Sequence, residues 1–185
     1  MLVGRRVLLS CMALAGCVSS NASAGSAPAA AVETIRVPTA TPGGTASLTT
    51  TTVANIATVS LPLARVWPVM ASVFDSLAIP LTTVDPGSHT IGNGDLKVRR
   101  RLGAESLRTY LNCGNTQGAP NSETFDIRLS VISQLTPDGP AGTTITTTVQ
   151  AMARPVSVSG EFLRCSSTGA LETRLGDIVA ARLKS

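Results

Sequence analysis

Two alternating runs of residues, separated by a loop rich in Pro and Gly, constrain the fold of this chain more than any other feature. Every second position is apolar or Thr in both runs (Phe125, Ile127, Leu129 and Val131; Ile145, Thr147, Val149 and Ala151). A period of two is typical of β-strands, and Pro137-Asp138-Gly139-Pro140 between the runs supplies a turn. The pattern therefore predicts an antiparallel hairpin that buries one face and leaves the other polar.

The clearest helical pattern spans residues 63–77. Its apolar side chains recur at intervals of three and four residues (Leu63, Val66, Trp67, Met70, Val73, Phe74 and Leu77), which places them on one face of an amphipathic helix. Pro68 lies inside this segment and is expected to bend the helix or delay its start, because it lacks a backbone N–H. A second apolar stripe predicts a C-terminal helix (Leu171, Leu175, Ile178, Val179 and Leu183).

Weaker patterns complete the expected arrangement. Further strands are expected at residues 32–37, 46–51, 53–61 and 96–102, a short helix at residues 105–111, and a tight turn at Gly92-Asn93-Gly94-Asp95. This order of elements favours an α+β fold. We expect an antiparallel β-sheet with the long amphipathic helix and the C-terminal helix packed on one face.

The N-terminal residues resemble the signal of a bacterial lipoprotein. Arg5 and Arg6 precede a short apolar segment, residues 7–14, which is far below the ~20 apolar residues that span a membrane. Leu14-Ala15-Gly16-Cys17 is similar to the lipobox, after which bacteria lipidate the cysteine and cleave the chain before it. The resemblance implies a signal peptide over residues 1–16 and acyl chains, such as palmitate, on Cys17.

The small residues and Pro of residues 17–31 predict a flexible tether between this anchor and a single domain. The domain is expected over residues 32–185 and is best defined from residue 50 onward. Val18 occupies the position where a signal for retention in the inner membrane would resemble an Asp. The expected location is therefore the outer membrane of the cell envelope, facing the periplasm.

Two alternatives to this interpretation of the N-terminus are open. Cleavage after Ala22-Ser23-Ala24 by an ordinary signal peptidase would leave a soluble periplasmic protein. Arg5-Arg6 also suggests twin-arginine export, although the flanking Gly4 and Val7 do not resemble that longer motif.

Four cysteines are present, and they have different expected fates. Cys11 leaves with the signal and Cys17 carries the lipid, so Cys113 and Cys165 remain as an even pair in an oxidising compartment. They are expected to form a disulfide. A reactive thiol or a metal-binding pair is the alternative, but the chain has one histidine and no CxxC spacing. We expect no metal and no cofactor.

Charge and aromatic content argue against nucleic-acid binding. The formal net charge of +4 includes Arg5 and Arg6 and falls to +2 without them, and aromatic residues make up 3% of the chain. Too few aromatic side chains are present for a stacking platform. We expect no nucleic acid among the partners.

Three groups of residues are candidate sites, and each has a simpler explanation. Lys97, Arg99 and Arg101, next to Arg100 and Arg108, form a basic cluster that would suit anionic head groups or an acidic protein surface; alternatively, they form a solvated strand face. Trp67, Met70 and Phe74 would line an apolar cavity or fill an ordinary core. His89 is a general base or a surface histidine, and no nucleophile motif accompanies it.

The element order and the lipobox together resemble the helix-grip-like domains of bacterial envelope lipoproteins. Among these is BamC, an accessory lipoprotein of the machine that assembles outer-membrane barrels. The resemblance covers residues 50–185 and includes the helical sequence ARVWPVMASVFDSLAIP, residues 64–80. The chain departs from BamC in its paired cysteines, in CSSTGALE at residues 165–172 and in having room for one domain. No functional residue is transferred.

These observations lead to three hypotheses about function. The first is a non-enzymatic, membrane-anchored interaction or adaptor module whose partners are envelope proteins, in a process such as envelope assembly. The second is a small carrier that binds a lipid or another apolar ligand between helix and sheet. The third is a hydrolase that uses His89.

Overall fold

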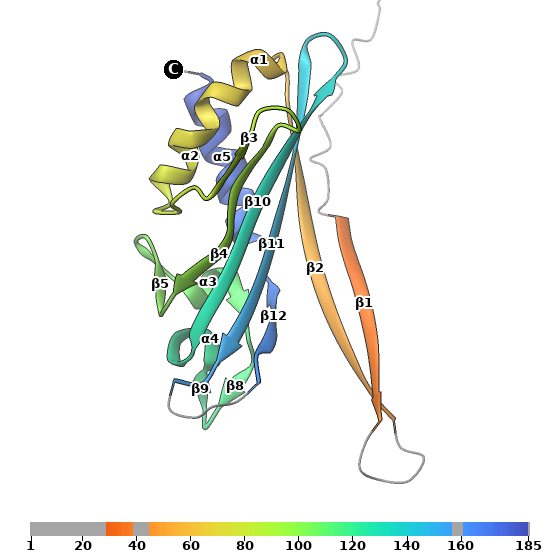
Figure 1. Cartoon of the computed structure of the whole chain (residues 1–185), viewed down its shortest axis with the longest axis vertical. Helices are drawn as coiled ribbons and strands as arrows, with labels where there is room; N and C mark the ends of the chain where they lie inside the picture. Colours follow the sequence, from red (N-terminus) through yellow and green to blue (C-terminus); the bar gives the residue numbers. More distant parts are fainter. Residues whose placement is uncertain (1–28, 39–44, 157–160, 185) are drawn as a thin grey trace, which may run out of the picture.

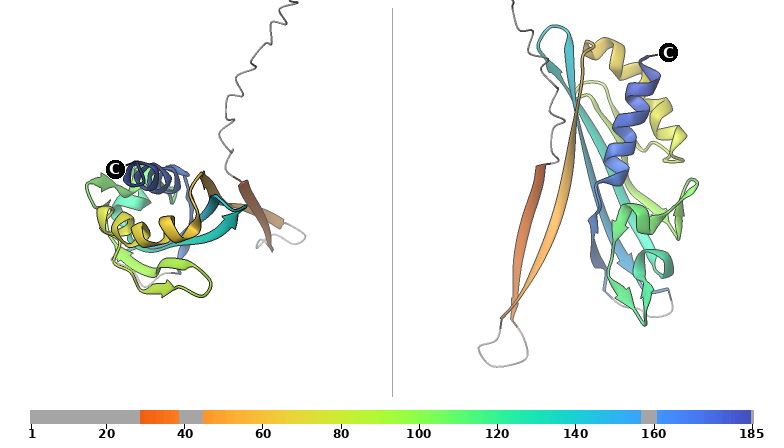
Figure 2. Two further views of the ribbon diagram at one scale, coloured as in Figure 1. Left: turned by 90° about the horizontal axis from the view of Figure 1, so that it is seen from above. Right: turned by 180° about the vertical axis from the view of Figure 1, so that it is seen from behind.

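The computed structural model describes residues 29–38, 45–156 and 161–184. Cys17, the expected signal peptide and the expected tether up to residue 28 lie outside these residues. The described chain folds into an antiparallel β-sheet with helices on one face (Figures 1 and 2), and the predicted α+β class is confirmed.

The main sheet has the strand order β1-β2-β11-β10-β4-β3, with β12 beside β11 and β7 beside β12. Its strands are β1 (Ala29–Pro38), β2 (Thr45–Val59), β3 (Thr83–Asp85), β4 (Thr90–Val98), β7 (Leu111–Asn112), β10 (Asp126–Asp138), β11 (Gly142–Arg154) and β12 (Leu163–Ser167). Every pair is antiparallel. The predicted hairpin is the centre of this sheet, and its register runs from Asp126 opposite Arg154 to Asp138 opposite Gly142.

The alternation in the sequence matches the burial of the two hairpin strands. On the inner face, the side chains of β10 and β11 are buried (Ile127, Leu129, Val131, Ser133 and Leu135; Thr143, Ile145, Thr147, Val149, Ala151 and Ala153). Two of the inner polar groups satisfy each other, because the hydroxyls of Ser133 and Thr147 are 2.8 Å apart. The outer face of the same strands carries mostly polar and charged residues, with Ile132 and Met152 as the apolar exceptions.

The long helix is interrupted where Pro68 predicts an irregularity. It consists of α1 (Leu63–Val66), the 3-10 turn η1 (Trp67–Val69) and α2 (Met70–Ser76), with Pro68 inside the turn. The C-terminal helix α5 (Ala170–Arg182) packs beside it over the inner face of the sheet (Figure 2). Both apolar stripes face the core, where Val66, Met70, Val73, Leu171 and Leu175 are buried. Among the described helices, none is long and apolar enough to cross a membrane.

The expectation of a tight turn at residues 92–95 is wrong. These residues lie inside β4, where the register against β10 shifts between Leu129 and Val131 and marks a β-bulge. The side chain of Asn93 is buried in the bulge; its amide donates to the Pro80 carbonyl at 2.6 Å and its oxygen accepts the Asp95 backbone N–H at 2.9 Å. A Gly-Asn-Gly-Asp sequence is typical of turns, but here it supplies a bulge.

The expected strand over residues 96–102 also ends early. β4 stops at Val98, and Arg100 has a φ of 63°, which an extended strand does not tolerate. Short elements then connect to β10: β5 (Arg101–Leu102), β6 (Glu105–Ser106), α3 (Leu107–Tyr110), β8 (Asn115–Thr116), β9 (Ala119–Pro120) and α4 (Asn121–Thr124). Helix α3 confirms the short helix expected at residues 105–111.

The first two strands form a long ribbon at the edge of the sheet. The two strands expected at residues 46–51 and 53–61 are one strand, β2, which pairs with β11 over Ala54–Val59. Beyond that overlap β2 pairs with β1, and the ribbon diverges from the body of the domain (Figure 1). β1 begins at Ala29, so the last residues of the expected tether belong to this strand.

Candidate functional site

A hollow of about 560 Å³ lies where the C-terminal end of β4, the start of β10 and the end of β11 meet. We call it the basic hollow, because Lys97, Arg99, Arg128 and Arg154 line it together with one carboxylate, Asp126. Phe162, Val98 and Ile127 complete the lining. Four cations around one carboxylate make this an electropositive surface.

Strand register brings these cations together on the outer face. Lys97 lies opposite Arg128, Arg128 lies opposite Met152, and Met152 lies opposite Arg164, so one row crosses four strands. Opposite residues in an antiparallel pair point to the same side of a sheet. This row therefore places three cations and an exposed Met on the face that the helices do not cover.

A second row lies beside the first at the end of the sheet. Asp126 is opposite Arg154 and forms a loose ion pair with Arg99, 3.9 Å from Oδ1 to Nε. The guanidinium groups of Arg128 and Arg154 lie 5.7 Å and 5.1 Å from the ring centroid of Phe162, within cation–π range. The aromatic ring is thus close to two cations, and the Phe162 residue is still 38% exposed.

The structure brings together only part of the basic cluster seen in the sequence. Lys97 and Arg99 line the basic hollow. Arg101 does not, because the turn at Arg100 carries it onto β5, where its side chain donates to the Ala104 carbonyl. Arg108 on α3 pairs with Glu123 at 3.8 Å.

Sequence reasoning missed Arg128, Arg154 and Phe162. Arg128 stands at a polar position of an alternating strand, and Arg154 lies just beyond the other alternating run. Their proximity depends on the register of β10 against β11, which places Arg154 opposite Asp126. The sequence could have placed Arg128 near Arg154 only if the register of the hairpin had been estimated from the length of its turn.

Two other hollows have a different character. One of about 1110 Å³ lies between β2, α3 and α5, and its walls carry both signs of charge, including Glu105 and Arg174, which form an ion pair at 3.7 Å. The other, of about 480 Å³, is lined by Arg100, Arg101, Ser106, Glu123 and Thr124. Neither combines an excess of cations with an exposed aromatic ring.

The residues proposed to line an apolar cavity are part of the core or lie beside it. Met70 and Phe74 are completely buried. Trp67 is partly buried, and its ring meets the edge of His89 with centroids 5.4 Å apart. None of the three lines any of the hollows above.

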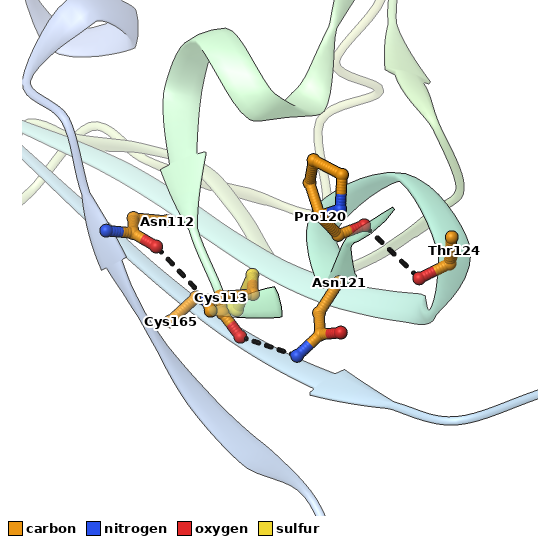
Figure 3. Close-up of a disulfide and its surroundings, with 7 residues drawn as sticks. Asn112, Cys113, Pro120, Asn121, Thr124 and Cys165 are labelled. Carbon is orange, nitrogen blue, oxygen red and sulfur yellow. Dashed lines mark hydrogen bonds between the residues drawn. A yellow bond between two sulfur atoms is a disulfide. The ribbon is translucent and has the colours of Figure 1, made fainter. Parts of the chain in front are cut away.

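Cys113 and Cys165 form a disulfide, as expected (Figure 3). Cys165 lies on β12 opposite Ala151, and Cys113 follows β7 directly, so the bond lies beside the β7–β12 pairing. The backbone around it is held by Asn121, whose amide donates to the Cys113 carbonyl at 3.0 Å. The disulfide therefore joins the short elements of residues 99–125 to the edge of the main sheet.

Glu172 is a buried carboxyl in the first turn of α5. Its side chain is 2% exposed; Oε1 accepts a hydrogen bond from the Ser167 hydroxyl at 2.6 Å, and Oε2 has no partner among the described residues. Burial raises the pKa of this carboxyl above its usual value, and the hydrogen bond from Ser167 opposes the increase only in part.

We expect the raised pKa of Glu172 to make the domain less stable as the pH rises. Above the ordinary carboxyl pKa, the unfolded chain loses this proton while the folded chain keeps it. The free energy of unfolding therefore falls with pH until the folded pKa is passed. Glu172→Gln should remove this component in urea unfolding between pH 4 and 8, whereas the exposed Glu161→Gln should not. Identical pH profiles for Glu172→Gln and the unmodified chain would contradict the buried, protonated carboxyl.

No family model and no curated protein matches this chain. Within the part of the chain that the structure describes, no three His, Cys, Asp or Glu side chains are grouped so as to hold a metal ion. The basic hollow is the arrangement on the described surface with the most distinctive chemistry, and it is suited to holding negative charge.

Proposed function

We propose that this chain is a bacterial lipoprotein, anchored by acyl chains on Cys17 in the outer membrane and facing the periplasm. Its domain is a non-enzymatic interaction module that holds a negatively charged partner in the basic hollow. The lipobox supports the anchor, and the ~20 apolar residues of a membrane-spanning helix are not needed for a chain held by lipid.

The observation that carries the proposal is the composition of the hollow. Lys97 and Arg154 form no ion pair with a described carboxylate. Arg99 pairs with Asp126 at 3.9 Å and Arg128 pairs with Asp95 at 2.6 Å, but both pairs are about half exposed. Exposed pairs of this kind contribute little to stability. Cations that do not stabilise the fold remain available to a partner.

The carrier and hydrolase hypotheses receive no comparable support. A carrier needs an apolar cavity between helix and sheet, but Met70 and Phe74 fill the space under α2, and the walls of the hollow between β2, α3 and α5 carry both signs of charge. His89 lies against Trp67, and the neighbouring Ser88 hydroxyl donates to Asp85 at 2.7 Å. We therefore retain the interaction module.

One experiment in intact cells tests both parts of the proposal. A photo-reactive amino acid replaces Met152, in the row of cations, or Gln134, which is exposed on the outer face of β10 farther along the strand. We expect adducts at position 152 and few at position 134. Radioactive palmitate should label the chain and should not label Cys17→Ser, which should also leave the membrane fraction after a wash in about 0.5 M salt.

The labelling with palmitate tests the lipid anchor, and the photo-crosslinking tests the interaction surface, so each part of the proposal can be contradicted separately. A Cys17→Ser chain that still incorporates palmitate, or still resists the salt wash, would contradict the lipid anchor. Equal adduct yields at positions 152 and 134 would contradict the basic hollow as the interaction surface.

A further inference from the structure

We propose that the basic hollow and the apolar side chains around it bind the anionic lipid surface of a membrane. The inference rests on the proposed function and names the partner of the same surface. It makes the domain a second, electrostatic point of attachment beside the acyl anchor.

Exposed apolar side chains gather around this hollow. Within residues 54–156 and 161–184, whose side-chain exposure is known, five large apolar residues are exposed. Four of them lie on or next to the end of β11 and the start of β12: Met152 (44%), Val156 (48%), Phe162 (38%) and Leu163 (46%). The fifth, Val84, is on β3. Exposed apolar residues scattered singly need no explanation, but a group of this kind marks an interaction surface.

Charge is also concentrated at this end of the sheet. This end of the sheet carries more cations than carboxylates. The cations are Lys97, Arg99, Arg128, Arg154 and Arg164, and the carboxylates are Asp95, Asp126 and Glu161. Farther along the hairpin, the outer positions of β11 are uncharged (Thr144, Thr146, Thr148 and Gln150). No cation occupies the outer positions of β10 or β11 farther along the hairpin, so the positive charge of this face is concentrated at one end.

The combination of cations with apolar side chains points to a lipid surface. Cations near a bilayer attract anionic head groups, while aromatic and aliphatic side chains enter the boundary between head groups and acyl chains. Phe162 fits this arrangement, because Arg128 and Arg154 lie beside its ring and leave it partly exposed. A free phosphate ion would use the cations but not the four apolar side chains.

The proximity of the membrane strengthens the interaction. A chain held by its acylated Cys17 meets the bilayer at a high effective concentration, so even a weak surface contact is populated. The contact needs no deep pocket, which agrees with the open position of the basic hollow on the outer face.

Vesicle binding of the purified Cys17→Ser full chain tests the inference without the acyl anchor. We expect binding to phosphatidylcholine vesicles that contain about 30% phosphatidylglycerol and no binding to phosphatidylcholine alone. Raising the salt from about 0.05 M to 0.5 M should weaken binding at least tenfold. Inorganic phosphate should compete no better than chloride at equal ionic strength.

Matched variants locate the binding surface. Each cation contributes about fivefold near an anionic bilayer, so Lys97→Gln/Arg154→Gln should bind about 25-fold more weakly. Arg65→Gln/Lys184→Gln removes the same charge from exposed positions on α1 and after α5, and should bind within about twofold of the parent chain. Phe162→Ala should weaken binding at both salt concentrations.

The outcomes separate this inference from the proposed function. Equal binding of the two double variants, or equal binding to neutral and anionic vesicles, would overturn the lipid surface as the partner. Protein adducts in place of phospholipid adducts at position 152 in cells would also overturn it, while the interaction module would stand. The absence of any position-specific adduct would remove the proposed function itself.

Discussion

Replacing both Cys113 and Cys165 by Ala is expected to lower the free energy of unfolding by about 4 kcal/mol. The two cysteines are 52 residues apart in the sequence. In the chain-entropy description, a bond that closes a loop of this length removes a large number of conformations from the unfolded chain. A loss of this size is a large part of the roughly 5–15 kcal/mol by which a typical domain is stable.

Because of its position, the disulfide stabilises one region of the domain in addition to the domain as a whole. The pairing of β7 with β12 involves only Asn112 with Ser166 and Leu111 with Ser167, and it lies next to the disulfide. Short pairings of this kind hold poorly on their own. We expect the reduced domain to exchange the amide hydrogens of residues 99–125 faster than those of β10 and β11.

Urea unfolding checks this prediction, with reduction of the unmodified chain as the control. Both treatments remove the bond and should shift the midpoint by similar amounts, although the Ala variant also loses two buried sulfur atoms. Both thiols should resist alkylation until reductant is added. Prompt alkylation of the oxidised, folded chain, or an unchanged midpoint, would contradict the disulfide.

The elements that the sequence predicts well are those whose burial repeats regularly. The stripe from Leu63 to Leu77 and the alternation of Ile127, Leu129 and Val131 each follow the period of one element packed on one side. Such a pattern can be recognised in the sequence of the segment alone, without knowing which element packs against it. The hairpin and both helices are therefore visible in the chain, and so is the α+β class.

The candidate site depends on information of a different kind. Lys97, Arg128 and Arg154 are far apart in the sequence, and they meet because β4 and β11 pair with opposite edges of β10. A bulge in β4 sets which of its residues reaches Arg128. The run of basic residues from Lys97 to Arg101 suggests one cluster, but a single backbone conformation at Arg100 divides it between two surfaces.

Replacing Gly92 by Ala, next to the β-bulge in β4, is expected to lower the free energy of unfolding by about 3 kcal/mol. A Cβ at this position would lie 2.1 Å from the Val131 carbonyl oxygen and 2.9 Å from the Ile132 Cα, both of them backbone atoms of β10. β10 cannot move away easily, because its other edge pairs with β11 along its whole length. Gly92 is therefore required by close approach of two backbones.

Gly94, two residues farther along the same strand, is the matched control. A Cβ there would meet nothing within 4 Å, and its φ is not positive. Gly94→Ala should therefore be neutral or raise the free energy of unfolding by about 0.4–1 kcal/mol, because it restricts the unfolded chain. If residues 92–95 formed the turn that their sequence suggests, neither Cβ would meet the backbone of β10. Similar midpoints for the two variants in urea unfolding would thus contradict the register of β4 against β10, and with it the placement of Lys97 beside Arg128.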